Sequence, residues 1–583
     1  MRRIAVVFAA LLFATAASAA GTSDKISAIP DVGAKTRVRL ANAKPVTARH
    51  AMVVTAQHLA TDIGLRILKK GGNAIDAAVA VGYALAVVHP CCGNLGGGGF
   101  LVAHLANGKS LFLDFREKAP LAATPAMFQD KAGNVVRGLS TRSWLAVGVP
   151  GTVMGLDEAL ARYGTMPLAK VMAPAIALAR DGFVLTEGDA HILAIGAKRF
   201  RKYPDVAAIF LHKDGTPLKA GERLIQPQLA RTLKRIAKGG TDAFYKGAIA
   251  RAVVAASEKN GGILTMKDFA DYTAPWSAPV TCRYRGYTVV SAPPPSSGGV
   301  TLCEILQIVK AYPFRKWGYA SVKATHYLIE AERRAFADRN TYLGDPAFVT
   351  NPIAKLLAPA HIAKIRAAIA PDKATPSSEV AGSLGAPEGR HTTHISIVDA
   401  KGNTVGVTYT LNLFYGNARI AGDTGFFLND EMDDFTSRPG VPNAYGLVQG
   451  KINQIEPGKR PLSSMTPTIV LRKGRVFMVA GSPGGSTIIS TVLEGILNVV
   501  DFGMNMQQAV DAPRLHHQWL PDAVMVEPGY LTAKTKPALE AMGYRFVERS
   551  PWGANEAILK DPKTGLLEGA NDARRASGSA AGY

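Results

Sequence analysis

Cysteine, charge and long apolar runs are all scarce in this sequence of 583 residues. Its four cysteines are too few for a disulfide-stapled scaffold, which relies on many bridges in a short chain. Charged residues make up 19% and hydrophobic residues 47%, a balance that excludes general disorder. No stretch beyond the N-terminus is apolar enough to cross a bilayer. The composition is that of a large globular protein, with residues enough for one extensive core or two domains.

Two enzyme signatures are also missing. The pattern Gly-x-Ser-x-Gly does not occur, which argues against an ordinary serine esterase. Gly108-Lys109-Ser110 resembles the end of a phosphate-binding loop, but that pattern needs a glycine where the chain has Ala103. The sequence contains no RNA- or DNA-binding motif either.

The first twenty residues are typical of a secretory signal peptide. Arg2 and Arg3 precede a short apolar run, and Ala17-Ser18-Ala19 is a small-residue cleavage site with the cut after Ala19 or Ala20. A membrane anchor is the alternative, but the run is short for a span and its flank is small and polar. We therefore expect a periplasmic or secreted mature protein without a transmembrane segment.

Charge is distributed unevenly along the chain. From Thr392 to the end the basic and acidic residues are equal in number, so the net charge of +22 belongs to the preceding part. A basic region can indicate nucleic-acid binding. An exported protein meets little nucleic acid, so we expect no nucleic-acid partner and favour loose attraction to anionic envelope surfaces.

In an oxidising compartment the four cysteines can form bridges. Cys282 and Cys303 are the better candidates for one. We expect a structural role for Cys91 and Cys92, because neighbouring cysteines rarely serve as paired metal ligands.

Residues 371–391 have the Pro, Ser, Gly and Ala content of an exposed, mobile linker. The charge balance changes at the end of this segment. Such a point is either an ordinary boundary or a processing site, and these two observations alone favour the boundary.

Two strands with half-buried patterns follow the linker. Apolar residues at 395 and 397, and at 405, 407, 409 and 411, alternate with polar residues or glycine. Residues 400–402 suit a three-residue hairpin loop with Gly402 in the left-handed conformation. Matching the apolar faces places Thr392 opposite Thr410, with Asn412 one step beyond. The pattern alone would make these two an ordinary pair of strand threonines.

The chain resembles the γ-glutamyltranspeptidase family of N-terminal-nucleophile hydrolases, and the resemblance covers nearly all of the mature chain. The segments that carry it, in order, are 70–74, 93–99, 114–117, 392–394, 410–412, 429–435, 460–465 and 481–486. The family implies an α+β fold, a four-layer αββα sandwich with two antiparallel sheets between helices. It also implies one precursor cut between His391 and Thr392. The products are a large subunit of residues 21–391 and a small catalytic subunit of residues 392–583.

The resemblance assigns the chemistry to Thr392. Cleavage gives this residue a free α-amine, whose reference pKa of about 7.7–8.0 lets it act as base for its own hydroxyl. Thr410 orients Thr392, and the amides of Gly484 and Gly485 stabilise the oxyanion at the start of a helix.

The resemblance also assigns the substrate contacts. A γ-glutamyl group ends in a carboxylate and an ammonium. Arg116, Ser463 and Ser464 match the carboxylate site. Asn412, Glu431 and Asp434 match the ammonium site. We expect residues 436–450 to form a lid that carries Tyr445 over the pocket.

The expected activity is that of a γ-glutamyltransferase and glutathione hydrolase. Its donors are γ-glutamyl compounds such as glutathione and glutamine, and its acceptors are water, amino acids or dipeptides. We expect no metal and no organic cofactor, and a structural role for His516 and His517, which have no acidic or cysteine neighbour in the sequence. One rival is an acylase of glutaryl chains, against which Asp434 argues. The other is an envelope protein that has lost activity, against which the presence of Thr392, Gly484 and Gly485 argues.

Overall fold

A computed structural model of the chain describes residues 34–380 and 392–583. The expected signal peptide and the expected cut between His391 and Thr392 therefore lie outside the described residues or at their edge. None of the described helices is long and apolar enough to cross a membrane.

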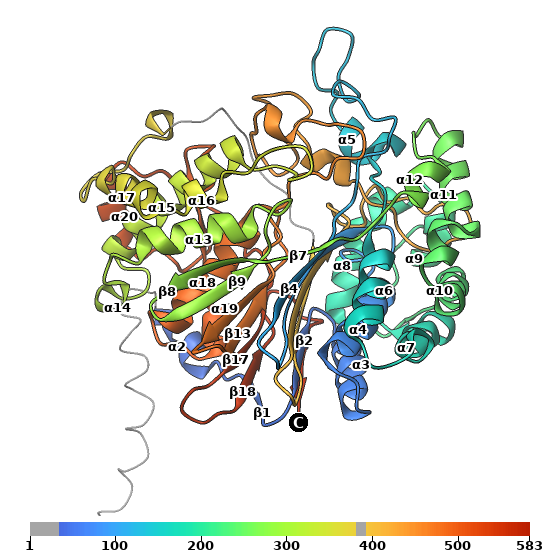
Figure 1. The fold of residues 1–583 in the computed structure, drawn as a ribbon, viewed down its shortest axis with the longest axis horizontal. Coiled ribbons are helices and arrows are strands. Elements are labelled where there is room, and N and C mark those ends of the chain that lie inside the picture. Colours follow the sequence, from blue (N-terminus) through green and yellow to red (C-terminus); the bar gives the residue numbers. More distant parts are fainter. Residues whose placement is uncertain (1–33, 381–391) are drawn as a thin grey trace, which may run out of the picture.

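Two seven-stranded antiparallel sheets form the centre of the described part of the chain (Figure 1). The first sheet has the order β1 (Val46–Ala48), β18 (Leu567–Ala570), β17 (Glu556–Lys560), β13 (Arg475–Gly481), β12 (Thr468–Arg472), β9 (Tyr287–Ser291) and β8 (Val280–Tyr284). The second has the order β19 (Ser579–Gly582), β2 (Met52–Thr55), β10 (Thr393–Val398), β11 (Thr404–Thr410), β3 (Gly98–His104), β4 (Ser110–Phe115) and β7 (Trp276–Ser277). Small sheets join β14 (Leu515–His516), β15 (Val524–Val526) and β16 (Phe546–Glu548), and β5 (Phe183–Val184) and β6 (Arg223–Leu224).

Helices cover the outer face of each large sheet, so the predicted αββα sandwich is confirmed (Figure 1). The helices on the side of the second sheet are α3 (His58–Lys69), α4 (Ala74–Val88), α6 (Thr152–Tyr163), α7 (Leu168–Asp181), α8 (Glu187–Phe200), α9 (Pro204–Phe210), α10 (Pro227–Tyr245), α11 (Ala248–Lys259) and α12 (Met266–Ala270). Those on the side of the first are α2 (Ala34–Asn42), α13 (Gly298–Val309), α14 (Phe314–Trp317), α15 (Val322–Tyr342), α16 (Ile353–Leu356), α17 (Pro359–Ala367), α18 (Thr487–Val500), α19 (Met506–Asp511) and α20 (Thr535–Ala541). The short α5 (Leu139–Arg142) lies at the top of the view in Figure 1.

Helix α4 shows how the sequence sets these elements. Asn73 caps its first turn and Asp76 returns the bond to the Asn73 amide, which forms a capping box. All of its residues are buried. It ends at His89, before Pro90, as the sequence predicts.

The hairpin of β10 and β11 has the predicted register. Ile395 pairs with Val407 and Ile397 with Val405, and Gly402 has a φ of 88°. The prediction that the strands are half-buried is wrong, since every residue of both is buried. The apolar face packs against α4 and the polar face meets the other large sheet. The polar side chains bond to one another there: His394 contacts Thr408 at 2.8 Å and Ser396 at 3.0 Å.

Both pairs of cysteines are bonded. Cys282–Cys303 is the expected bridge, and it links β8 to α13. Cys91 and Cys92, which are neighbours in the sequence, also form a disulfide. The sequence predicted a structural role for them but not this bond.

The described part of the linker is not exposed throughout. Residues 371–373 are exposed, but Ser377 is buried. Its hydroxyl donates to the Trp519 carbonyl at 2.6 Å and its amide to Asp522 at 2.7 Å. These bonds attach the segment to the body of the protein before it reaches the expected cut.

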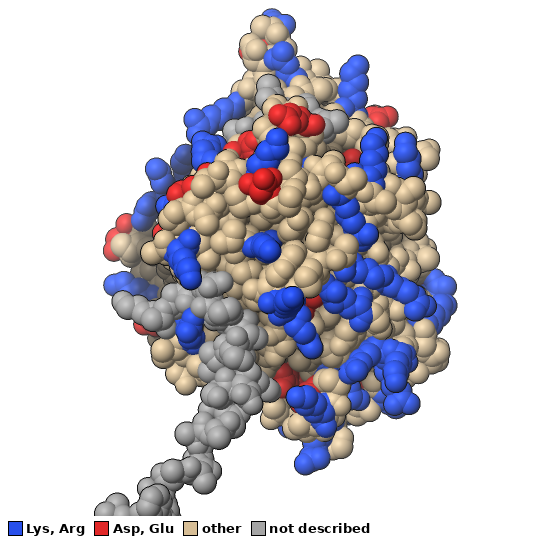
Figure 2. Space-filling view, turned by 90° about the vertical axis from the view of Figure 1, so that its left-hand side faces the viewer, with Lys and Arg blue, Asp and Glu red and all other residues tan. Residues whose placement is uncertain are grey.

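The positive net charge is visible at the surface. Figure 2 shows many Lys and Arg side chains spread over one face, with few Asp or Glu side chains between them.

Candidate active site

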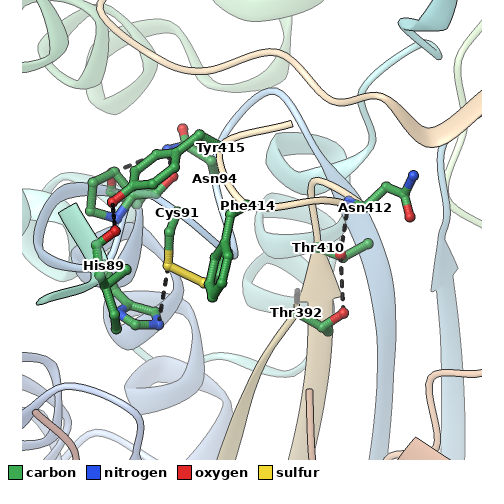
Figure 3. The surroundings of a disulfide bond; sticks show 12 residues. His89, Cys91, Asn94, Thr392, Thr410, Asn412, Phe414 and Tyr415 are labelled. Atoms are coloured by element: carbon green, nitrogen blue, oxygen red, sulfur yellow. Dashed lines mark hydrogen bonds between the residues drawn. A yellow bond between two sulfur atoms is a disulfide. The ribbon is translucent and has the colours of Figure 1, made fainter. Parts of the chain in front are cut away.

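Thr392 and Thr410 face each other at one end of the hairpin (Figure 3). Their hydroxyl oxygens are 3.2 Å apart, and both residues are buried. The Thr410 hydroxyl also accepts a hydrogen bond from the Asn412 amide at 2.9 Å. Thr410 is thus fixed by its own strand and can orient the Thr392 hydroxyl.

These two threonines line a cavity with nearly all of the other predicted site residues. The cavity wall includes Arg116, Asn412, Glu431, Asp434, Tyr445, Ser463, Ser464 and Gly485. Gly484 precedes this wall and is not part of it. Segments far apart in the chain therefore converge on Thr392, as the resemblance implies.

Arg116 is fully buried and lies among three carboxyl groups. Its guanidinium donates to Glu431 and, at 2.5 Å, to Asp434, while Glu117 lies 3.5 Å away. The resemblance assigns Arg116 to the substrate carboxylate and Glu431 and Asp434 to the ammonium, and the motifs alone do not show that these three side chains bind one another.

The cluster is short of positive charge. Burial raises the pKa of Glu117 to about 7, although Arg116 opposes the shift. Burial also raises the pKa of Glu431 well above its usual range, again against Arg116. One guanidinium cannot keep three buried carboxyl groups ionised, and an added cation would favour their ionised forms.

Two acceptor atoms of residues that line the cavity beside this cluster have no donor within the described part of the chain. They are Oδ1 of Asn412 and Oε2 of Glu431, and both are buried. Unmet buried acceptors cost about 1–3 kcal/mol each, so they favour a ligand with several N–H donors.

The serines on the opposite wall are held by a residue that the sequence analysis missed. Arg339, in α15, donates to Ser464 at 2.9 Å and to Ser297 at 2.8 Å. The Ser297 hydroxyl in turn donates to the Ser463 carbonyl at 2.7 Å. Burial lowers the pKa of Arg339 to about 10, so it stays charged near neutrality.

The glycine turn before α18 requires residues without side chains. Gly484 has a φ of 141° and Gly485 a φ of 57°. A Cβ on Gly485 would lie 2.3 Å from a ring carbon of Tyr445. Gly485 and Ser486 line the cavity and α18 begins directly after them, so the positive end of that helix lies beside the cavity.

Gln518 joins the glycine turn to the predicted lid. Its Oε1 accepts from the Ser486 hydroxyl at 2.6 Å. Its Nε2 donates to the carbonyls of Tyr445 and Gly446 at 3.4 and 3.3 Å. The sequence predicted roles for the neighbouring His516 and His517 but none for Gln518.

The two histidines are structural, but the expected lack of acidic neighbours is wrong for His517. His516 bonds to Ser490 at 2.8 Å and to Gln518 at 3.0 Å. The His517 amide donates to Glu332, which folding brings from α15, and the His517 ring lies 3.4 Å from Asp522, five residues further along the chain. Burial lowers the pKa of His516 to about 3 and of His517 to about 4, so both are neutral at pH 7.

The Cys91–Cys92 disulfide supports the segment that follows Thr410 (Figure 3). The Tyr415 amide donates to the Cys91 carbonyl at 2.7 Å, and Cys91 Sγ lies 3.5 Å from His89 Nε2. Burial lowers the pKa of His89 to about 3, which leaves its imidazole neutral.

Comparison with known proteins decides the family. The sequence model of the family described as gamma-glutamyltranspeptidase matches residues 60–583. The chain belongs to the γ-glutamyltranspeptidase family.

Members of this family are close relatives along the whole chain. The chain is 54% identical to a glutathione hydrolase proenzyme of Pseudomonas sp. (strain A14), with 94% of this chain and 96% of the other covered. It is 48% identical to the glutathione hydrolase proenzyme of Escherichia coli (strain K12), with 92% and 93% covered. Among solved structures it resembles a cephalosporin acylase from Bacillus halodurans, with a TM-score of 0.81, 29% identity, and 92% of this chain and 97% of that chain covered.

Proposed function

We propose that this γ-glutamyltranspeptidase cuts itself between His391 and Thr392 and then transfers γ-glutamyl groups from glutathione or related donors to water or to an amine. The observation that carries the proposal is the placing of the Thr392–Thr410 pair beside a buried cluster of one guanidinium and three carboxyl groups. That combination supplies a nucleophile and a charged pocket for an amino acid head.

The first reaction is processing. The Thr392 hydroxyl oxygen attacks the His391 carbonyl carbon, the peptide C–N bond breaks, and the proton of the hydroxyl ends on the Thr392 nitrogen. Water then hydrolyses the resulting ester, which gives a carboxylate on His391 and a free hydroxyl and amine on Thr392. Residues 21–391 and 392–583 remain together as a heterodimer.

The second reaction is acyl transfer. The α-amine of Thr392 takes the hydroxyl proton as the oxygen attacks the γ-amide carbonyl of the donor. The amides of Gly484 and Gly485 stabilise the oxyanion, and losing one such donor costs about 2.7–4 kcal/mol in the barrier. The amine product of glutathione, cysteinylglycine, leaves with the proton. The γ-glutamyl group then passes from the Thr392 oxygen to water or to an acceptor amine, and the free Thr392 hydroxyl is restored.

The γ-glutamyl head fits the charges of the pocket. Arg116, Ser463 and Ser464 bind its carboxylate. Asn412, Glu431 and Asp434 bind its ammonium. A zwitterion adds no net charge, but it supplies N–H donors for the unmet oxygens of Asn412 and Glu431. Binding therefore exchanges the direct contacts of Arg116 with Glu431 and Asp434 for contacts with the substrate.

Residues 436–450 serve as a lid over this head. Tyr445 and Leu447 of this segment line the pocket, and Tyr445 is buried against Asn412. The lid limits the access of water to the acyl-enzyme. No metal or organic cofactor takes part in the steps described.

We also propose that the enzyme is exported and that residues 1–20 are removed. Amino-terminal sequencing of the large subunit from an envelope fraction tests this. A start after Ala19 or Ala20 supports export, and an intact Met1 in the processed enzyme contradicts it.

One experiment decides the activity. The purified enzyme is incubated with glutathione and excess glycylglycine, and the products are identified by mass spectrometry. γ-Glutamyl-glycylglycine establishes transfer, while glutamate and cysteinylglycine alone establish hydrolysis. If the chain is cut but neither set appears, the donor assignment is wrong.

A second candidate is a glutaryl acylase, which the likeness to a cephalosporin acylase favours. Paired assays with γ-glutamyl and glutaryl anilides separate the two. Asp434 beside Arg116 predicts a preference for the donor with the ammonium. A preference for glutaryl would support the acylase.

A further inference from the structure

Three helices on the outer side of the first sheet bring an imidazole and two carboxyl groups together. Glu304 lies in α13, Asp338 in α15 and His361 in α17. His361 Nε2 is 2.7 Å from Asp338 Oδ2 and 3.6 Å from Glu304 Oε1. These residues each offer one ligand atom, and all three atoms lie within 4.8 Å of one another. The cluster is separate from the cavity around Thr392.

Glu304 is the unusual member. Its side chain is 1% exposed, and Oε1 has no hydrogen-bond donor within the described residues although it faces His361. A buried carboxylate oxygen without a donor is costly. The other two side chains are partly exposed, 23% for His361 and 20% for Asp338. The cluster is therefore deep on one side and open to solvent on the other.

Charge points to a cation. In the described part of the chain neither carboxyl group has an ion pair with Lys or Arg, and His361 is the basic partner of both. With both carboxyl groups ionised, a protonated imidazole leaves one negative charge in the cluster. A divalent ion with a neutral imidazole balances both carboxylates.

We propose that Glu304, Asp338 and His361 bind one divalent first-row transition ion, with Zn²⁺ the best match. Zinc takes one imidazole nitrogen and carboxylate oxygens at about 2.0–2.2 Å, which sets neighbouring ligand atoms about 3.3–3.6 Å apart. The measured separations of 2.7 and 3.6 Å need only small side-chain movements to reach that geometry. Water from the open side completes the coordination. A single nitrogen with two oxygens and no thiolate disfavours Cu⁺.

The ion would fasten α13, α15 and α17 to one another. A second contact already joins two of them, because Arg366 in α17 donates to the carbonyl of Ile308 in α13 at 3.1 Å. Asp338 immediately precedes Arg339, the residue that holds Ser464. The site is thus structural, and it acts on the end of α15 that supports the pocket.

The test measures zinc on the tag-free, processed enzyme after treatment with EDTA, at pH 8 because the metal displaces a proton from imidazole. Isothermal titration with ZnCl2 and elemental analysis after dialysis against micromolar zinc are applied to the wild type, His361→Gln and Asp338→Asn. His212→Gln is the matched control, because His212 also pairs with a carboxylate, Glu222 at 3.1 Å, but at a position more open to solvent, where its side chain is 36% exposed.

We expect one zinc per heterodimer in the wild type and in His212→Gln, and affinity lowered by about 100-fold or more in the other two variants. Zinc should raise the thermal midpoint of the wild type and control but not of the two site variants. Cleavage into two chains shows that each variant folds. Equal zinc binding by the wild type and His361→Gln, or no binding by the wild type at micromolar zinc, overturns the proposal. In that case the cluster is an ion pair of protonated His361.

Discussion

The Tyr445 hydroxyl donates a hydrogen bond of 2.7 Å to the carbonyl of Asn412. The proposed lid, residues 436–450, is therefore attached directly to the segment that follows Thr410. Tyr445 also fills the space beside Gly485, so one side chain contacts both Asn412 and the glycine turn.

Removing only that hydroxyl should loosen the lid. A buried hydrogen bond contributes about 0.5–1.5 kcal/mol, so we expect Tyr445→Phe to raise the donor KM by about 3- to 10-fold. More water should reach the acyl-enzyme, which raises hydrolysis relative to transfer. Donor kinetics with and without glycylglycine measure both. Tyr203→Phe, in a tyrosine outside the cavity, is the control, and equal behaviour of the two variants would refute the role of the lid.

A methyl group at Gly485 should disable the oxyanion turn. It would press on the Tyr445 ring and also strain a backbone with a φ of 57°. We expect Gly485→Ala to lower kcat by about 10²–10³-fold, because the amide donors move from their places. The control is Gly474→Ala, where φ is 74° but a Cβ would meet nothing within 4 Å. Comparable falls in kcat in both variants would mean that backbone strain, and not the position of the amide donors, accounts for the loss.

Gln518 should act as a positioning residue. Gln518→Ala breaks the link between Ser486 and the carbonyls of Tyr445 and Gly446. We expect kcat/KM for the donor to fall by about 10-fold, which is the loss of about 1.4 kcal/mol, with the fall shared between kcat and KM. Gln507→Ala, whose amide bonds to Asp511 and Asn571, is the comparison. A purely structural role would lower the thermal midpoint and leave KM unchanged.

The buried pair of Tyr83 and Asp157 predicts a pH effect on stability. Burial raises the pKa of Asp157 from 3.8 to about 7, although the 2.6 Å hydrogen bond from Tyr83 opposes the shift. The folded protein therefore holds a proton that the unfolded chain releases. This contribution to stability is present below about pH 4 and is lost as the pH rises towards 7.

Asp157→Asn cannot lose that proton. Other buried acids also titrate, so the quantity to compare is the difference in thermal midpoint between variant and wild type. We expect this difference to shift in favour of the variant between pH 4 and pH 7. Asp423→Asn, at an exposed position, should follow the wild type throughout. A constant offset for Asp157→Asn would contradict the raised pKa.

Local pattern was sufficient to predict the hairpin and the Thr392–Thr410 pair. A period of two residues and a left-handed glycine leave one register that keeps Ile395 and Ile397 on the apolar side. The same pattern could not tell that a second sheet covers the polar side. His394 and Ser396 look like surface residues until the second sheet is known, in which the Glu556 carbonyl accepts from the Ser396 hydroxyl.

Contacts between distant segments account for what the sequence analysis missed. Arg339 reaches Ser464 across 125 positions, and nothing around it in the sequence marks a site. Gln518 stands beside two more conspicuous histidines. The motifs identified Arg116, Glu431 and Asp434 but not their pairing, because that depends on where the folded chain places them.

The order of strands determines whether processed molecules can exchange their two subunits. A cut before Thr392 leaves β10 between β2, from the first product, and β11, from the second. The other large sheet likewise has β1, β9 and β8 of the first product flanking strands of the second. Separating the products would therefore break strand pairing in both sheets, and its free energy would be comparable to that of unfolding. Two differently tagged populations, once processed, should not form hybrids on mixing, and a damaged half cannot be replaced by a fresh copy.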